Sequence, residues 1–332
     1  MSEPVLEVDD LRTHIVLGRG TVRAVDGVSL KVGPAETLGI VGESGSGKTM
    51  TGLSILRLLP KAGGRTVSGR ILVDGVDVLE LSEAEMARDW RGRRISMVSQ
   101  DPLTSLNPLF TAGDQVSAPL RYHGLAQGAA ALRRAATDLL RRVRIPAPEQ
   151  RVDAFPHQLS GGMRQRVVSA MAIACSPRVM IADEPTSNLD VTIQVQLMNL
   201  YRELQADTGL AIILITHDLG VAASICDRVA VMYAGRIVES GDVRAIFHRA
   251  AHPYTQALLA SVPHLGRRQG RLYALGGQPP SLIDPPHGCR FAARCAHKMA
   301  KCEAEYPPDF DVGGGHVSAC WLAEREGASR AA

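Results

Sequence analysis

Two short stretches of the chain carry the residue types of phosphate chemistry. The first is GESGSGKT, which matches the pattern G-x-x-x-x-G-K-[ST] in full. Its glycines allow backbone N–H groups to turn inward around phosphate oxygens, and a helix starting at the loop adds partial positive charge. Lys48 is expected to reach the outer phosphates of a nucleotide and Thr49 to hold Mg²⁺. The residues expected to bind the nucleotide here are Gly42, Glu43, Ser44, Gly45, Ser46, Gly47, Lys48, Thr49 and Met50.

The second stretch is VMIADE, residues 179–184, in which an apolar run ends in two carboxylates. In α/β proteins, ligands bind at the carboxyl ends of the strands. Asp183 suits the Mg²⁺ shell, and Glu184 is expected to orient and deprotonate an attacking water. Together with the glycine loop, these acids predict hydrolysis of a magnesium nucleotide rather than binding alone.

The flanking segments supply the elements that would position these residues. ETLGIVG before the glycine loop has the length of a buried strand, and MTGLSILRLL after it has helical apolar spacing. The 332 residues allow one large domain with an appendage. The net charge of +3 and the 4% aromatic content argue against a nucleic-acid binder. No leader peptide or run of ~18 apolar residues is visible, so a soluble, cytoplasmic chain is expected.

Further motifs fall in a fixed order around these two stretches. LSGGMRQR lies at 159–166, Gln100 follows the apolar run ISMVS, SNLD lies at 187–190, and His217 follows AIILIT. The sequence resembles the ATP-binding-cassette (ABC) family in these motifs and their order. The resemblance implies an α/β P-loop NTPase of ABC type, with a RecA-like core and an N-terminal antiparallel β part. It covers residues 5–245, with a helical subdomain at about 101–166.

The resemblance also assigns roles to the motif residues. Glu184, His217 and Gln100 are the expected catalytic residues. Ser160, Gly161 and Gly162 open a helix and form a second anion site. The family uses a head-to-tail dimer, in which this second site closes on the ATP of the opposite subunit. The residues expected to act there are Ser160, Gly161, Gly162, Gln165 and Asp190. Ile15 stands where many members have an aromatic residue against adenine, so it can pack on the base without π-stacking.

Two other stretches resemble one branch of the family. QDPLTSLNP and HPYTQALL are similar to segments of oligopeptide, dipeptide and nickel importer ATPases. This resemblance implies an ATPase subunit, peripheral on the cytoplasmic face of the bacterial inner membrane, that energises import. It implies a second, often non-identical ATPase subunit, two membrane permeases and an extracytoplasmic binding protein as partners, without nucleic acid. The alternative is a soluble ABC ATPase that acts on nucleic acid and carries a metal-binding tail.

Four of the six cysteines cluster near the C-terminus, with spacings C-x5-C-x6-C-x17-C. The set is Cys289, Cys295, Cys302 and Cys320. The spacing leaves unligated thiols, zinc and a 4Fe–4S cluster open, and the importer resemblance favours 4Fe–4S. A metal-folded accessory module at about 286–322 is expected within the C-terminal extension, 246–332. Cys175 and Cys226 lie in apolar stretches and are expected to be buried.

Overall fold

A computed structural model describes residues 3–262 and 275–324 of the chain. Residues 263–274 and 325–332 of the expected C-terminal extension, 246–332, lie outside the described residues. The chain divides into two compact units that interleave along the sequence. The first unit comprises Met1–Leu6, Val32–Thr37 and Leu72–Ile215. The second unit comprises Glu7–Lys31, Leu38–Ile71 and Thr216–Ala332.

The first unit is built on three parallel strands. They are β6 (Ile95–Val98), β7 (Val179–Asp183) and β8 (Ala211–Thr216), in the spatial order β8-β7-β6. Every residue of β7 and β8 is buried, as near-continuous apolar runs predict. Val98 aligns with Ala182, so β6 and β7 end at the same edge of the sheet.

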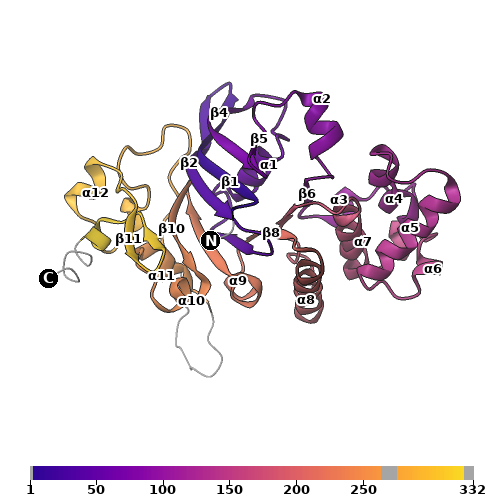
Figure 1. Cartoon of the computed structure of the whole chain (residues 1–332). Helices are drawn as coiled ribbons and strands as arrows, with labels where there is room; N and C mark the ends of the chain where they lie inside the picture. Colours follow the sequence, from indigo (N-terminus) through magenta and orange to yellow (C-terminus); the bar gives the residue numbers. More distant parts are fainter. Residues whose placement is uncertain (1–2, 263–274, 325–332) are drawn as a thin grey trace. The chain divides into compact units, whose positions relative to one another are not determined.

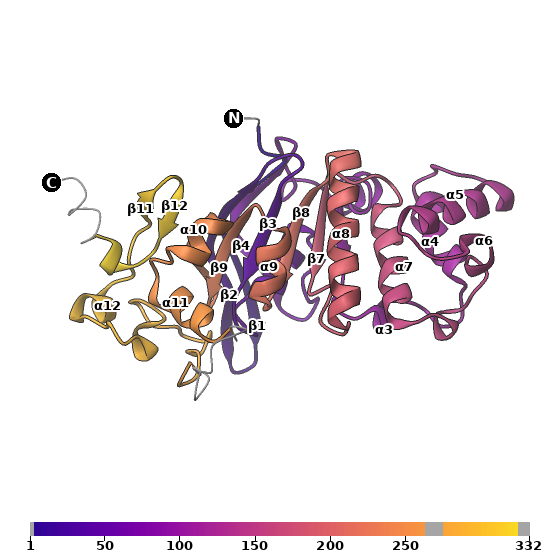
Figure 2. The ribbon, with the colours of Figure 1, turned by 90° about the horizontal axis from the view of Figure 1, so that it is seen from below.

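Helices make up most of the rest of this unit, and α4, α5 and α6 gather beside α7 (Figure 1). Helix α5 is amphipathic, because it buries Ala136 and Leu140 and exposes arginines. Helices α7 and α8 lie side by side (Figure 2), where the hydroxyls of Ser169 and Tyr201 are 3.1 Å apart. The elements are β5 (Val76–Asp77), α2 (Glu83–Glu85), the π-helical turn η1 (Met86–Trp90), α3 (Pro102–Ser105), α4 (Ala112–Tyr122), α5 (Ala129–Arg142), α6 (Pro148–Arg151), η2 (Pro156–Gln158), α7 (Gly161–Ile173) and α8 (Val191–Thr208).

The second unit contains strands of two sheets. One sheet has the order β11-β12-β10-β9-β3, with β3 parallel to β9 and the other neighbours antiparallel. The other has the order β2-β1-β4, and two residues join β1 to β2, a connection that antiparallel neighbours make. The strands are β1 (Leu6–Leu17), β2 (Gly20–Val32), β3 (Thr37–Val41), β4 (Gly64–Val73), β9 (Arg228–Tyr233), β10 (Arg236–Asp242), β11 (Phe310–Gly313) and β12 (His316–Ser318). The helices are α1 (Lys48–Ile55), α9 (Leu219–Ile225), α10 (Val243–His248), α11 (Pro253–Ala260), η3 (Ala292–Arg294) and α12 (Ala300–Ala304).

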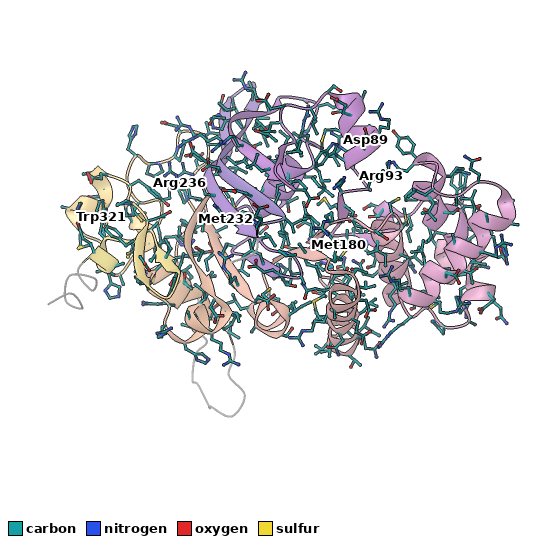
Figure 3. The ribbon with its side chains drawn as sticks, in the orientation of Figure 1. Asp89, Arg93, Met180, Met232, Arg236 and Trp321 are labelled. Carbon is teal, nitrogen blue, oxygen red and sulfur yellow. The ribbon has the colours of Figure 1, made fainter. Side chains whose placement is uncertain are left out.

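The cysteine segment, about residues 286–322, is joined to this sheet. Its strand β12 pairs with β10, and the buried carboxylate of Glu239 on β10 accepts a hydrogen bond from His316 Nε2 at 2.7 Å. The same carboxylate accepts the backbone N–H groups of Ala251 and His252 at 2.6 and 3.1 Å. Trp321 lies in the segment beyond β12 (Figure 3) and packs in a small core with Cys302. The segment thus extends the sheet of the second unit.

No helix in the described parts of the chain is both long and apolar enough to cross a membrane. Of the two cysteines outside the cluster, Cys226 is buried, as expected. The expectation for Cys175 is wrong, because this residue is half-buried after the end of α7.

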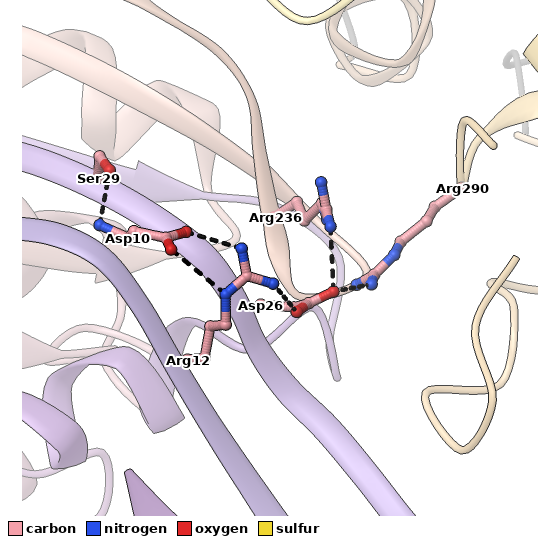
Figure 4. A network of polar contacts seen from close by, with 6 residues as sticks. All are labelled: Asp10, Arg12, Asp26, Ser29, Arg236 and Arg290. Atoms are coloured by element: carbon pink, nitrogen blue, oxygen red, sulfur yellow. Dashed lines mark hydrogen bonds and ion pairs between the residues drawn. The ribbon is translucent and has the colours of Figure 1, made fainter. Parts of the chain in front are cut away.

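The buried carboxylate of Asp26 on β2 contacts three arginines (Figure 4). Asp26 is 2% exposed and accepts hydrogen bonds from Arg290, from Arg236 at 3.3 Å and from Arg12 at 3.0 Å. Burial alone would raise the pKa of Asp26, but the charges of Arg290 and Arg236 outweigh it and hold the pKa below its ordinary value. The ionised Asp26 therefore links β2, the start of β10 and the cysteine segment.

Replacing Asp26 by Asn should lower the free energy of unfolding by about 3–5 kcal/mol at pH 7, because it leaves buried guanidinium groups without their anion. The difference from wild type should shrink below about pH 4, because a carboxylate with a depressed folded pKa loses its contribution as pH falls. Urea unfolding across pH measures both effects. The matched control Asp10→Asn removes a 58%-exposed partner of Arg12 and should cost about 0–1 kcal/mol. Equal losses for the two variants would contradict the role given to Asp26.

Candidate functional site

The glycine loop connects β3 to α1 in the second unit, as the sequence predicts. Gly47 is the N-cap of α1, with φ +107°, and Lys48 is 4% exposed. The Lys48 ammonium donates to the carbonyl oxygens of Gly42 at 2.7 Å and Glu43 at 2.9 Å. The loop therefore wraps around its lysine at a helix N-terminus, an arrangement that offers backbone donors and positive charge to an anion.

Residues outside the glycine loop also form hydrogen bonds that hold it in place. The N–H of Gly235 donates to Ser46 O at 2.7 Å, and the Asp26 N–H donates to Gly235 O at 2.9 Å. Ser46 is buried, yet among the described residues its hydroxyl has no hydrogen-bond partner. A buried hydroxyl without a partner is costly, so Ser46 is suited to donate to a bound oxyanion. Thr49 is exposed in the first turn of α1 and Met50 is half-buried.

Two expected catalytic residues meet in the first unit, where β6 and β7 end. Gln100 Nε2 donates to Glu184 Oε2 at 3.0 Å. Glu184 follows β7 directly and has φ +45°, a left-handed backbone that non-glycine residues seldom adopt. Its N–H donates to Ile215 O at 2.8 Å, which holds this conformation. Asp183 is the last residue of β7 and is buried, as the sequence predicts.

The expected second anion site also lies in the first unit, at the start of α7. Ser160 is the N-cap and its hydroxyl accepts the Met163 N–H at 3.3 Å. Apart from its chain neighbours and its own helix, no atom of the described residues lies within 4 Å of where a side chain at Gly161 would begin. A side chain at Gly162 would meet Ile193 at 2.8 Å. The Gly161 side of the helix start is therefore open to an approaching group.

The other residues expected to act at the nucleotide site lie in or next to different elements. Gln165 is 1% exposed within α7, and Asp190 caps α8 by accepting the Ile193 N–H at 3.0 Å. His217 is exposed directly after β8. Ile15 is half-buried in β1. The roles expected of these residues stay predictions.

The four clustered cysteines line one cavity of the second unit, together with His252. Among the described residues, however, no group of three or more His, Cys, Asp or Glu side chains is arranged to hold a metal ion. Burial raises the pKa of the Cys289 and Cys320 thiols to about 11, with a smaller contribution from neighbouring cysteines. The metal-binding role that the importer resemblance implies for these cysteines stays a prediction.

The histidine of HPYT faces this cavity. His252 caps α11, its Nδ1 accepts the Tyr254 N–H at 3.0 Å, and burial lowers its pKa to about 4. The ring is therefore neutral and carries its proton on Nε2. This nitrogen is buried and has no partner among the described residues. In the sequence, HPYTQALL indicated only a resemblance to importer ATPases, and no local pattern signalled a donor at the cysteine cavity.

Sequence reasoning also missed two contacts of Glu43 in the glycine loop. Its backbone N–H donates to the hydroxyl of Tyr254, and its carboxylate pairs with Arg294 beside Cys295. Each partner lies more than 200 residues away along the chain.

Comparisons with known proteins agree with this arrangement. The family model for ABC transporters matches residues 25–187, and that for the oligopeptide/dipeptide transporter C-terminal region matches residues 238–302. The dipeptide transport ATP-binding protein DppD of Bacillus subtilis is 48% identical, covering 97% of this chain and 96% of its own. The oligopeptide transport ATP-binding protein OppD of the same organism is 49% identical, covering 96% and 88%.

A solved structure supports the fold. The dimeric ATP-binding cassette MJ0796 bound to ADP and Pi superposes with a TM-score of 0.64 at 26% identity. The match covers 72% of this chain and 99% of that one.

Replacing Gly47 by Ala should destabilise the protein by about 3 kcal/mol or more, since its new methyl group would lie 2.3 Å from Ala24 O at a left-handed backbone position. Gly45→Ala is the matched control, because Gly45 also has a positive φ, +77°, but beyond its chain neighbours no described atom lies within 4 Å of the added methyl group. The control should cost only about 1–2 kcal/mol. Urea unfolding compares the two variants, and equal losses would show that the contact with Ala24 does not constrain the loop.

Proposed function

Because the chain belongs to the ATP-binding proteins of oligopeptide and dipeptide ABC transporters, we propose that it binds and hydrolyses ATP to energise import of di- or oligopeptides, or of a related cargo such as nickel. The observation that carries the proposal is the glycine loop, with Lys48 enclosed at the start of α1 and a buried Ser46 hydroxyl suited to an oxyanion.

In the proposed hydrolysis, the loop N–H groups and Lys48 hold the β- and γ-phosphates of ATP. Thr49 and Asp183 would supply oxygen ligands to Mg²⁺, and the bound ion would neutralise phosphate charge. Glu184 takes a proton from the attacking water, and Gln100 orients the Glu184 carboxylate through its 3.0 Å hydrogen bond. His217 stabilises the γ-phosphate. Family membership and the Gln100–Glu184 contact support these assignments.

The proposed assembly places this chain against a second ATPase subunit. The helix start at Ser160 would contact the ATP held by that subunit, and the open space around Gly161 supports such an approach. Leu109 and Phe110, which follow Gln100 along the chain, are 80% and 53% exposed and offer an apolar surface to a permease. The chain would then lie peripherally on the cytoplasmic face of the bacterial membrane, under two permeases served by an extracytoplasmic binding protein.

For the cysteine cavity we propose a 4Fe–4S cluster held by Cys289, Cys295, Cys302 and Cys320, with zinc as the alternative. Either metal takes thiolate ligands, and all four thiols line one cavity. The four side chains would have to converge on the metal as it binds. The buried Nε2–H of His252 fits as well, because it could donate to a ligand sulfur. The bound group would cross-link distant parts of the segment and so supply folding energy.

Replacing Glu184 by Gln should preserve ATP binding but slow hydrolysis about 100-fold or more, because the amide cannot accept the proton of the attacking water. Phosphate release and nucleotide binding, measured on the same preparation, separate the two effects. The control Glu203→Gln removes an exposed carboxylate of α8 that pairs with Arg144, and it should hydrolyse ATP at the wild-type rate. Near-normal hydrolysis by Glu184→Gln would exclude Glu184 as the base.

Protein purified without oxygen should be brown and contain about four irons per chain. Cys302→Ser should lose most of this iron, because one of four ligands is missing, whereas Cys175→Ser should retain it. Metal analysis and visible absorbance provide the measurement. One zinc per chain would identify the alternative metal, and metal-free protein would show that the thiols are unligated.

A further inference from the structure

A residue of the cysteine segment reaches the glycine loop. Arg294, which lies directly before Cys295, donates from Nη1 to Glu43 Oε2 at 2.7 Å and from Nη2 to Glu43 Oε1 at 2.9 Å. The Arg294 side chain is only 4% exposed and that of Glu43 is 28% exposed. A bidentate ion pair of this kind fixes the orientation of both groups. Shielding from water strengthens the attraction between the two charges.

Arg294 is itself fixed by further hydrogen bonds. Its Nε donates to Gly276 O at 2.9 Å, and its Nη1 also donates to the hydroxyl of Tyr233 on β9 at 3.2 Å. Its Nη2 donates to Leu275 O at 3.4 Å. All three nitrogens of the guanidinium therefore donate hydrogen bonds. These bonds fix the orientation in which Arg294 contacts Glu43.

The backbone of Glu43 is fixed as well. Its N–H donates to the hydroxyl of Tyr254 at 2.9 Å, and Tyr254 is fully buried in α11. Its carbonyl oxygen accepts the Lys48 ammonium at 2.9 Å. Glu43 thus connects Arg294 and Tyr254 of the C-terminal extension to the lysine of the loop.

The pair also has an electrostatic consequence. Glu43 places a carboxylate in a loop built to receive phosphates, and a carboxylate without a partner would repel a nucleotide. Arg294 neutralises that charge. Lys48 and the loop N–H groups can then act on the phosphates without opposition from Glu43.

We propose that Arg294 is a positioning residue for the nucleotide loop, through which the folded cysteine segment sets the affinity for ATP. The inference rests on the proposed function, because it requires nucleotide binding at this loop. It makes the cysteine segment part of the nucleotide site rather than an independent appendage. Any event that unfolds the segment would then weaken ATP binding.

The test measures binding of a fluorescent ATP analogue to the full chain. Arg294→Ala should weaken affinity about 5- to 150-fold, the range typical of coupling between sites. Adding Glu43→Gln to Arg294→Ala should recover part of the loss, because the exposed charge is removed. High salt should reduce the defect of Arg294→Ala, since screening weakens the repulsion. Lys298→Ala removes a positive charge from the same segment, where it pairs with exposed Glu303, and should bind like wild type.

The outcomes are distinguishable. Wild-type affinity in Arg294→Ala would overturn the inference. A loss that neither Glu43→Gln nor salt relieves, together with a lowered melting temperature, would also overturn it, since Arg294 would then act only on folding. If Arg294→Ala does not fold, Arg294→Lys keeps the charge without the bidentate contact, and its affinity should lie below that of wild type. Wild-type protein that binds no nucleotide would overturn the proposed function itself, and this inference with it.

Discussion

The buried carboxylate of Asp26 must be compensated by positive charge, and its three arginines bring distant parts of the second unit to one point. Arg290 also donates to Ala234 O, in the turn between β9 and β10. The next residue of that turn, Gly235, accepts the Asp26 N–H and donates to Ser46 in the glycine loop. One anion thus joins the nucleotide loop, the turn between β9 and β10 and the cysteine segment. Arg294, which pairs with Glu43, lies four residues after Arg290 in the same segment.

Local sequence patterns predicted the structure correctly wherever it depends on a few adjacent residues. The apolar run of β7, the serine cap of α7 and the glycine before α1 all appear as predicted, because each depends on a few adjacent residues. Contacts between distant residues could not be predicted in this way. Arg294 and Glu43 are 251 residues apart, and His316 and Glu239 are 77 apart. Nothing in a single sequence indicates which arginine meets which acid, because the pairing depends on the packed fold.

The candidate base illustrates a different limit. The sequence places Glu184 after a buried strand, but its left-handed backbone follows from the surrounding structure. Its N–H is held by Ile215 and its carboxylate by Gln100. Non-glycine residues in this conformation cost of order 1–3 kcal/mol and persist where neighbours enforce them. The energetic cost thus falls on the residue proposed as the base, whose carboxylate accepts a hydrogen bond from Gln100.

The pairing of β12 with β10 also protects the sheet. Without the hairpin, β10 would present unpaired backbone donors and acceptors to other chains, a common starting point for aggregation. Strand β11, which takes the outer position in the described part of this unit, has only four residues and carries Asp311, both features that discourage further pairing. The cysteine segment therefore covers a strand that would otherwise lie at the edge of this sheet.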